Sequence, residues 1–299
     1  MVIEINNVRL DRNTRVVVQG ITGRMGSFQT KLMIDYGTNV VAGVTPGKGG
    51  MKIHGVPVYD TIFEAKEEKG PFDVAIAFVP PGSILDSCIE AVDAGVKLIV
   101  VTTADVPYLD AIKVIHYANK KGAKIVGPEA AGILVPHECK LGVHPVQPDK
   151  YFTKGPVGIV SRSGSLSYDT SRILSEAGIG QSAIVCIGGG PIWGTTMIDV
   201  IESLERDKDT EVILMLGEIG GTIEEETAEY IKRNVSKPVT ALIVGRYAPP
   251  GKSMGHASAI IMRGRGTWHA KVQSLRNAGV HVAKTFKDLL EIIQKHLKR

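Results

Sequence analysis

The stretch that decides the fold is Arg15-Val-Val-Val-Gln-Gly-Ile-Thr-Gly-Arg-Met-Gly26. A β-branched run, typical of a buried strand, leads into glycines at positions 20, 23 and 26 and then into a segment with helical periodicity up to Tyr36. Such a turn lets backbone amides approach an anion, and the N-terminus of the following helix favours a phosphate there. Alone, the motif fits a structural turn equally well. Its spacing is Gly-x-x-Gly-x-x-Gly, whereas the dinucleotide fingerprint has the spacing Gly-x-Gly-x-x-Gly.

Short apolar runs alternate with helical periodicity outward from this stretch through nearly the whole chain. We expect strands at 15–19, 40–44, 73–79, 97–101 and 124–126, then at 157–160, 183–187, 211–216, 238–244 and 281–284. Continuously apolar strands of this kind form parallel sheets with helices on both faces. A segment rich in Pro and Lys at 145–156 interrupts the pattern, which predicts a Rossmann-like domain at 1–148 and a flavodoxin-like parallel α/β domain at 149–299.

Composition excludes several classes of protein. With 43% hydrophobic and 22% charged residues among 299, the chain does not have the composition of a disordered protein. The net charge of +4 comes without a concentrated basic stripe, so we expect no nucleic-acid partner. Apolar runs are too short for a bilayer and no targeting peptide is recognisable, so we expect no membrane partner. Three separated cysteines without a Cys-x-x-Cys motif favour a reducing compartment, and we expect a cytoplasmic protein.

The second predicted strand ends in Gly43-Val-Thr-Pro-Gly-Lys-Gly-Gly50. A nicotinamide site would place an acidic residue here to bind the ribose hydroxyls, and none is present. Lys48 suits an additional phosphate, either that of NADP or the 3′-phosphate of coenzyme A (CoA). A solvated loop lysine is the alternative interpretation.

The second half carries three turns with chemical potential. Ser161-Arg-Ser-Gly-Ser-Leu-Ser-Tyr168 opens a helix with hydroxyls and amides that suit an anion, although Ser163 or Ser165 is also a simple N-cap. Glu218 follows a strand in a glycine-rich turn, where a buried acid needs a partner. His256 lies between Gly and Ala, and an imidazole becomes a competent phosphoryl nucleophile when a carboxylate fixes its tautomer.

We expect no metal site. The four candidate ligands follow one another without recognised metal spacing in a stretch expected to be a loop: His137, Glu138, Cys139 and His144.

The chain resembles the α subunit of succinyl-CoA synthetase (succinate–CoA ligase) from about Thr14 to Lys298. The strings GVTPGKGG, GIVSRSGSLSY, GEIGG and MGHASAII follow that family's pattern in order and spacing. The resemblance implies a CoA-binding domain, a phosphorylated histidine, and an ATP-grasp β subunit that brings ATP or GTP with Mg²⁺ in an αβ or α₂β₂ assembly. By position, it also implies CoA contacts at Thr22, Gly23, Arg24, Met25, Lys48, Thr102, Thr103 and Ala104, the phosphohistidine at His256, its carboxylate at Glu218, acid contact at Tyr168, and phosphate contact at Ser163 and Gly164.

Two departures from the family pattern concern the acid. The chain has Glu129-Ala130-Ala131 where the family has Asn-Cys/Thr-Pro, and Gly190 where it has Asp. A third departure lies in the CoA-contact segment, where Ala104 stands in place of the usual Glu. Succinate is the implied acid, and malate and citrate remain alternatives because a carboxylate at 129 repels an anionic substrate unless it is paired. An NAD(P)-dependent reductase and a CoA-binding regulatory module are the other interpretations of the glycine motif.

Overall fold

The computed structural model describes residues 3–145, 148–262 and 264–298. The chain divides into two compact units. The N-terminal unit comprises Glu4–Val146 with Ile192–Thr195, and the C-terminal unit comprises Gln147–Pro191 and Thr196–Arg299 with Met1–Ile3. Each unit contains a sheet dominated by parallel strands, so the α/β fold class expected from the sequence is confirmed.

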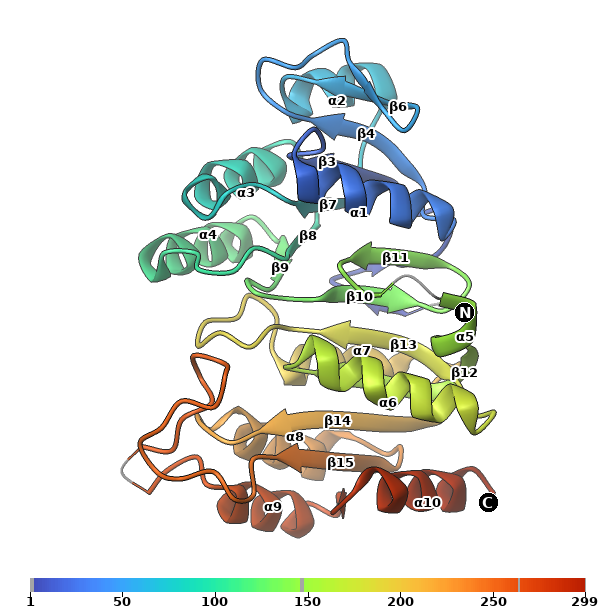
Figure 1. Ribbon diagram of the computed structural model, residues 1–299, viewed down its shortest axis with the longest axis vertical. Helices are drawn as coiled ribbons and strands as arrows, with labels where there is room; N and C mark the ends of the chain where they lie inside the picture. Colours follow the sequence, from blue (N-terminus) through green and yellow to red (C-terminus); the bar gives the residue numbers. More distant parts are fainter. Residues whose placement is uncertain (1–2, 146–147, 263, 299) are drawn as a thin grey trace. The chain divides into compact units, whose positions relative to one another are not determined.

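The N-terminal unit is built from strands joined mostly by helices, as the apolar runs predict (Figure 1). Its elements are β1 (Glu4–Ile5), β2 (Val8–Arg9), β3 (Val16–Gln19), α1 (Arg24–Asp35), β4 (Val40–Val44), β5 (Lys52–Ile53), β6 (Val56–Tyr59), α2 (Ile62–Lys69), β7 (Val74–Ala77), η1 (Pro81–Ser83), α3 (Ile84–Asp93), β8 (Leu98–Val101), α4 (Tyr108–Lys120), β9 (Lys124–Val126), β10 (Gly132–Val135) and β11 (Cys139–Gly142).

The main sheet of this unit has the order β5-β6-β4-β3-β7-β8-β9, parallel except for the short β5–β6 hairpin. The buried side chains of α2, α3 and α4 form one apolar core on one face of the sheet. Helix α1 packs on β3 and β4 and also contacts β11. The chain adds β4 and β6 on one side of the central β3 and then β7, β8 and β9 on its other side. The turn after β3 therefore lies at the switch point of the strand order, where ligands bind in such folds.

One expectation for this unit is wrong. The segment around residues 137–144, expected to be a loop, contains the antiparallel hairpin of β10 and β11, with Val135 opposite Cys139. In its turn, His137 has the left-handed conformation, with φ +64°. The sequence of this turn lacks the Asn-Gly or Asp-Gly pair by which common hairpins are recognised. Among the described residues, no three His, Cys, Asp or Glu side chains form a group that could hold a metal ion.

The C-terminal unit repeats the alternation (Figure 1). Its elements are α5 (Pro148–Tyr151), β12 (Lys154–Ser161), α6 (Gly164–Glu176), β13 (Gln181–Cys186), α7 (Met197–Arg206), β14 (Val212–Glu218), α8 (Ile223–Asn234), β15 (Val239–Val244), α9 (Trp268–Asn277), β16 (His281–Ala283) and α10 (Phe286–Leu297).

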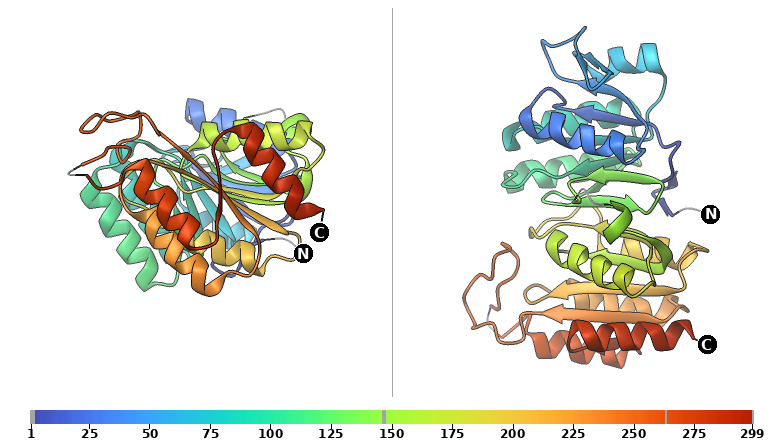
Figure 2. Two further views of the ribbon diagram at one scale, coloured as in Figure 1. Left: turned by 90° about the horizontal axis from the view of Figure 1, so that it is seen from below. Right: turned by 45° about the vertical axis from the view of Figure 1, so that its right-hand side comes forward.

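Its strands pair in parallel in the order β13-β12-β14-β15-β16. Helices α6 and α10 contact each other over one face, while α7, α8 and α9 form a series over the other. All five carboxyl ends therefore open at one edge. Between β15 and α9, the described residues 245–262 and 264–267, called segment 245–267 below, extend past this edge in both views of Figure 2.

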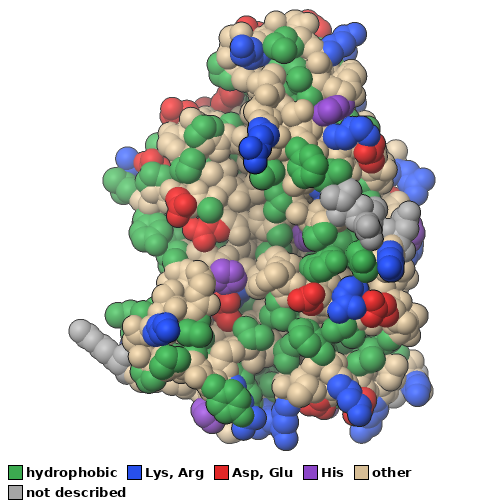
Figure 3. Space-filling view, viewed as in Figure 1, with side chains coloured by type: hydrophobic (Ala, Val, Ile, Leu, Met, Phe, Trp, Pro, Cys, Tyr) green, Lys and Arg blue, Asp and Glu red, His purple; other side chains and the backbone are tan. Residues whose placement is uncertain are grey.

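The surface and the helices add two observations. Figure 3 shows Lys and Arg side chains interspersed with Asp and Glu on the face that it draws. Among the described residues, no helix combines the length and the apolar character that crossing a membrane requires.

Candidate functional site

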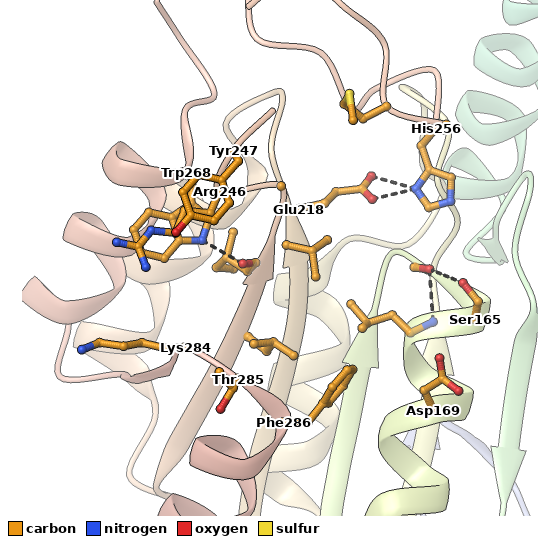
Figure 4. Close-up of a pocket in the computed structure, with 18 residues that line it drawn as sticks. Ser165, Asp169, Glu218, Arg246, Tyr247, His256, Trp268, Lys284, Thr285 and Phe286 are labelled. Carbon is orange, nitrogen blue, oxygen red and sulfur yellow. Dashed lines mark hydrogen bonds and ion pairs between the residues drawn. The ribbon is translucent and has the colours of Figure 1, made fainter. Parts of the chain in front are cut away.

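A histidine and a glutamate form a hydrogen-bonded pair at the carboxyl edge of the C-terminal sheet (Figure 4). Glu218 is the last residue of β14 and is buried, whereas the His256 side chain, from segment 245–267, is 34% exposed. The His256 Nδ1 lies 2.7 Å from Glu218 Oε2 and 2.9 Å from Oε1. Because a carboxylate only accepts, Nδ1 is the protonated nitrogen, and Nε2 carries the lone pair of a nucleophile. In Figure 4 the opposite nitrogen points away from Glu218.

The pair borders a cavity of about 980 Å³ within the C-terminal unit. Ser163 and Ser165, at the start of α6, also line this cavity. The Ser163 hydroxyl accepts a hydrogen bond from Leu166 N at 3.3 Å and lies 3.2 Å from the Ser165 hydroxyl. Ser163 is thus an N-cap, and the hydroxyls and the positive end of α6 still face the cavity where an anion would lie.

A glycine sets how closely His256 approaches the sheet edge. A Cβ atom placed on Gly189 would lie 2.5 Å from both Cγ and Cδ2 of the His256 ring. The Gly189 carbonyl accepts a hydrogen bond from the Ser258 hydroxyl at 2.6 Å. The glycine-rich turn after β13 therefore fits the ring, and any side chain at 189 would displace it.

Arg162 is the site residue that the sequence analysis missed. Its side chain is 1% exposed, and Nη2 lies 3.2 Å from Glu218 Oε1. Arginine is rarely buried, so its place in the SRSGS string indicated nothing more than a loop cation. A signal was available: β12 and β14 pair side by side with Ser161 opposite Leu216, which brings Arg162 and Glu218 to the same edge.

The glycine turn of the N-terminal unit is built from backbone. A Cβ atom on Gly26 would lie 2.1 Å from the Gly20 carbonyl oxygen, so only glycine allows this close approach. Gly23 is the N-cap of α1. Because it has no side chain to accept a hydrogen bond, the first amides of the helix remain without a side-chain cap. Thr22 is half-buried, while Arg24 and Met25 are exposed.

The second loop of this unit is held by a carboxylate. Asp60 Oδ1 accepts from the backbone amides of Lys48 at 2.9 Å and Gly49 at 2.8 Å. The Lys48 side chain is exposed. This arrangement fixes the loop and leaves its cation in solvent.

Glu129, one of the residues that depart from the family pattern, lies beside the third predicted CoA-contact segment, Thr102–Ala104. The Glu129 amide donates to the Thr103 carbonyl at 3.1 Å, and the Thr103 hydroxyl donates to the Val79 carbonyl at 2.9 Å. Glu129 is half-buried at φ +61°, and within the described residues it forms no ion pair. Its carboxylate is therefore not neutralised by a basic side chain of the described chain.

Tyr168 does not lie with His256. Its ring packs on Tyr151 at 5.5 Å and on Phe152 at 6.2 Å between ring centroids, and it is not among the described residues that line the cavity. Burial, with a smaller contribution from Tyr151, raises the pKa of the Tyr168 hydroxyl. It therefore remains a neutral group on α6.

Comparison with known proteins gives the class to which this geometry belongs. Residues 11–104 match the model of the CoA binding domain family, and residues 160–281 match that of the CoA-ligase family. The chain is thus a protein of the CoA-ligase class.

Two relatives specify the family. The succinate–CoA ligase [ADP-forming] subunit alpha 1 of Archaeoglobus fulgidus is 48% identical over 291 residues, which are 97% of this chain and 98% of that protein. The corresponding subunit alpha of Aquifex aeolicus is 49% identical over 293 residues, 97% of this chain and 95% of that one. The chain belongs to the family of succinate–CoA ligase (ADP-forming) α subunits, and the resemblance in its sequence is confirmed.

Solved structures share the fold. ATP citrate lyase from Methanothrix soehngenii, in complex with citrate and coenzyme A, matches with a TM-score of 0.88 at 26% identity over 98% of this chain. Our chain spans 51% of that longer one. The dinucleotide forming acetyl-coenzyme A synthetase 1 of Ca. Korarchaeum cryptofilum matches with a TM-score of 0.72 at 20% identity over 93% of this chain and 59% of that one, a likeness of fold alone.

Proposed function

We propose that this chain is the α subunit of a ligase that forms succinyl-CoA from succinate, CoA and ATP or GTP, releasing the nucleoside diphosphate and phosphate. The observation that carries the proposal is the His256–Glu218 pair beside a cavity at the start of α6. A histidine whose Nδ1 proton is held by a carboxylate presents Nε2 to phosphorus, which suits a phosphohistidine intermediate.

The reaction runs in three steps, stated from the acyl-CoA side. A phosphate oxygen attacks the thioester carbonyl, the C–S bond breaks, and CoA leaves as the thiol after taking a proton. Nε2 of His256 then attacks the phosphorus of the acyl phosphate, the P–O bond to the acyl group breaks, and the free carboxylate leaves. The phosphoryl group finally passes from Nε2 to an oxygen of the nucleoside diphosphate, which regenerates the imidazole.

The side chains of the C-terminal unit stabilise this sequence electrostatically. Glu218 accepts the hydrogen bond from Nδ1–H, and its negative charge compensates the positive charge that develops on the ring when Nε2 is phosphorylated. Ser163, Gly164 and the amides at the start of α6 offer hydrogen bonds to phosphoryl oxygens. In this proposal Tyr168 acts on the acid substrate from the same helix.

CoA is assigned to the N-terminal unit, and we propose residues 1–148 as the CoA-binding domain and 149–299 as the phosphohistidine domain. The matches to the CoA binding domain model at 11–104 and to the CoA-ligase model at 160–281 lie on either side of this boundary, which supports the division. The diphosphate would lie on the turn at Thr22–Met25, with its amides and the exposed Arg24. Lys48 would contact the 3′-phosphate, and Thr102–Ala104 the pantetheine end.

We propose that the nucleotide and Mg²⁺ belong to an ATP-grasp β subunit, in an αβ or α₂β₂ assembly. The relatives named as α subunits support a second chain. The sequence also has no Gly-x-x-x-x-Gly-Lys-Ser/Thr loop for a nucleoside triphosphate.

Glu129 is the residue that tests which acid is used. Its half-buried carboxylate lies beside Thr103 without an ion-pair partner in the described part of the chain. If it borders the acid, Glu129→Asn should increase the use of succinate relative to malate and citrate in a substrate panel. An unchanged preference would make Glu129 a structural residue.

The experiment that tests the function measures the phosphoenzyme. The chain, assembled with its β subunit and labelled ATP, should acquire phosphate that is labile in acid and stable in base. His256→Asn should remove this label, while His269→Asn, which alters an exposed histidine on α9, should retain it. Wild-type labelling of the His256→Asn complex would disprove the phosphohistidine, and hydride transfer from a reduced nicotinamide would instead support the reductase.

A further inference from the structure

The guanidinium of Arg162 contacts Glu218 and also the segment that carries His256. Nη2 lies 3.2 Å from Glu218 Oε1 and also donates to the hydroxyl of Ser258, two residues after His256. The carboxylate and the histidine segment are thus tied to one nitrogen. The planar fork of the arginine lets Nη2 make these two contacts while Nη1 binds the carboxylate of Glu224, whereas a lysine has one nitrogen for all three partners.

Ser258 passes this contact on to the sheet edge. While its oxygen accepts from Arg162, its hydroxyl donates to the Gly189 carbonyl, the glycine on which the His256 ring packs. The segment that carries the ring is therefore fixed to the turn after β13 through a residue that does not touch Glu218.

Arg162 itself is held on its other side. Nη1 lies 2.9 Å from Glu224 Oε1, and Glu224, 0% exposed, is paired with the equally buried Lys271 at 2.6 Å. A buried charge is costly unless it is paired and hydrogen-bonded, and these carboxylates meet that need. Charges thus alternate from Lys271 on α9 to His256 at the cavity.

We propose that Arg162 is a positioning residue for phosphoryl transfer. It holds Glu218 in the orientation that accepts the hydrogen bond from Nδ1–H, and through Ser258 it holds the His256 segment against the sheet. The imidazole consequently keeps one tautomer and one direction, with Nε2 toward the cavity. This inference rests on the proposed function, and it assigns to Arg162 an effect on the rate of phosphorylation and on the tautomer of His256, without contact to substrate.

Three variants separate positioning from mere stability. Arg162→Lys keeps the charge and removes the fork, and Ser258→Ala removes the link to the segment at a half-buried residue where unfolding is not expected. Lys271→Met is the matched control, because Lys271 is a buried cation of the same network that contacts neither Glu218 nor Ser258.

Four measurements apply to each variant. Rapid-quench labelling of the complex with the β subunit gives the rate of phosphoenzyme formation, alongside the KM for CoA. ¹⁵N NMR of histidine-labelled chain, with the His256 signal assigned through His256→Asn, gives the tautomer and needs neither nucleotide nor partner. Thermal unfolding midpoints show the loss of stability.

We expect Arg162→Lys to slow phosphorylation about 10- to 100-fold, as for a lost positioning contact, with the KM for CoA unchanged. Ser258→Ala should slow it severalfold, and both should shift the ¹⁵N signals toward a mixture of tautomers. Lys271→Met should lower the unfolding midpoint and leave rate and tautomer as in the wild type. If Arg162→Lys does not fold, Ser258→Ala decides.

Wild-type rate and tautomer in Ser258→Ala and any folded Arg162→Lys, or an equal slowing in Lys271→Met, would overturn the proposal. Failure of the proposed function has a different result: His256→Asn would retain its label, while the tautomer measurement would still report what Arg162 holds.

Discussion

The two units build their candidate sites from different materials. In the C-terminal unit, the candidate nucleophile His256 lies beside charged side chains that are themselves buried, Glu218 at 6% and Arg162 at 1% exposure. In the N-terminal unit, the turn at Gly20–Gly26 presents backbone amides. Two cations of the unit's candidate site, Arg24 in this turn and Lys48 in the second loop, are exposed.

The difference follows from what each site has to hold. A nucleophile must keep one tautomer and one direction, and fixed charges of low exposure achieve this because little water screens them. An anionic ligand with several phosphates is held by many weak donors, for which backbone and solvated side chains suffice. Changes of side chain should therefore damage the first site most, and changes that crowd the backbone should damage the second.

Glu218→Gln should have the largest effect of the changes that follow. The amide retains an oxygen acceptor for Nδ1 but removes the charge that compensates the phosphorylated ring. Phosphoryl transfer should slow by roughly 10²- to 10⁴-fold, the range for loss of an acid–base partner, without reaching zero. Rapid-quench labelling of the assembled complex measures it. Glu176→Gln at the exposed end of α6 is the control, and equal rates in the two variants would remove Glu218 from the mechanism.

Gly26→Ala should weaken the binding of CoA to the N-terminal unit, an effect that we do not expect from Glu218→Gln. The new methyl group would meet the Gly20 carbonyl at 2.1 Å, and the backbone of the turn must open to admit it. Overpacking of this kind costs about 1–3 kcal/mol. If only the backbone of the turn moves and the rest of the unit keeps its structure, this cost corresponds to roughly 10- to 100-fold weaker CoA binding. Calorimetric titration with CoA tests this, with phosphorylation by ATP unaffected.

Gly82→Ala is the matched control in the same unit, since its methyl group would meet nothing within 4 Å. Unchanged CoA affinity in Gly26→Ala would mean that the turn has no part in binding CoA. Equal weakening in both variants would show a general loss of structure.

These examples also show what sequence predicts. The apolar runs that became β3, β4, β7, β8 and β9 were recognisable because strands buried on both faces are continuously apolar. The His256–Glu218 contact followed from chemical need, as a buried acid requires a partner. Arg162 was missed because its burial depends on the neighbouring strand, and hairpin β10–β11 because its turn uses His137 in a left-handed conformation without a glycine signal.

Lys48→Glu should have a smaller effect, which salt should reduce further. Exposed ion pairs are worth about 0–1 kcal/mol, so reversing the charge should raise the KM for CoA roughly tenfold at low ionic strength. At high salt the difference should shrink, because the Debye length falls to about 3 Å at 1 M. Lys52→Glu, another exposed residue near the loop, is the control. A KM that is unchanged at low salt would exclude Lys48 from the CoA site.

His144→Gln tests a titratable group that is buried in the N-terminal unit, apart from the candidate loops. We expect it to change how the stability of the fold depends on pH. Burial, aided by the nearby charge of Lys140, lowers the pKa of His144 to about 3. Below pH 6.5 the unfolded chain takes up a proton that the native imidazole does not, so this group makes the fold less stable as the pH falls from 6.5 toward 3. Between pH 7 and 5 the loss is about 2 kcal/mol in the free energy of unfolding.

Urea unfolding of wild-type chain and His144→Gln at both pH values isolates this contribution. The stability of the variant should fall less on acidification, while that of His116→Gln, which alters an exposed histidine on α4, should fall as in the wild type. The KM for CoA at pH 7.5 should be the same in all three chains, because burial at 144 supports the fold rather than the loops. A variant that loses as much stability as the wild type between pH 7 and 5 would show that His144 already accepts its proton in the native state.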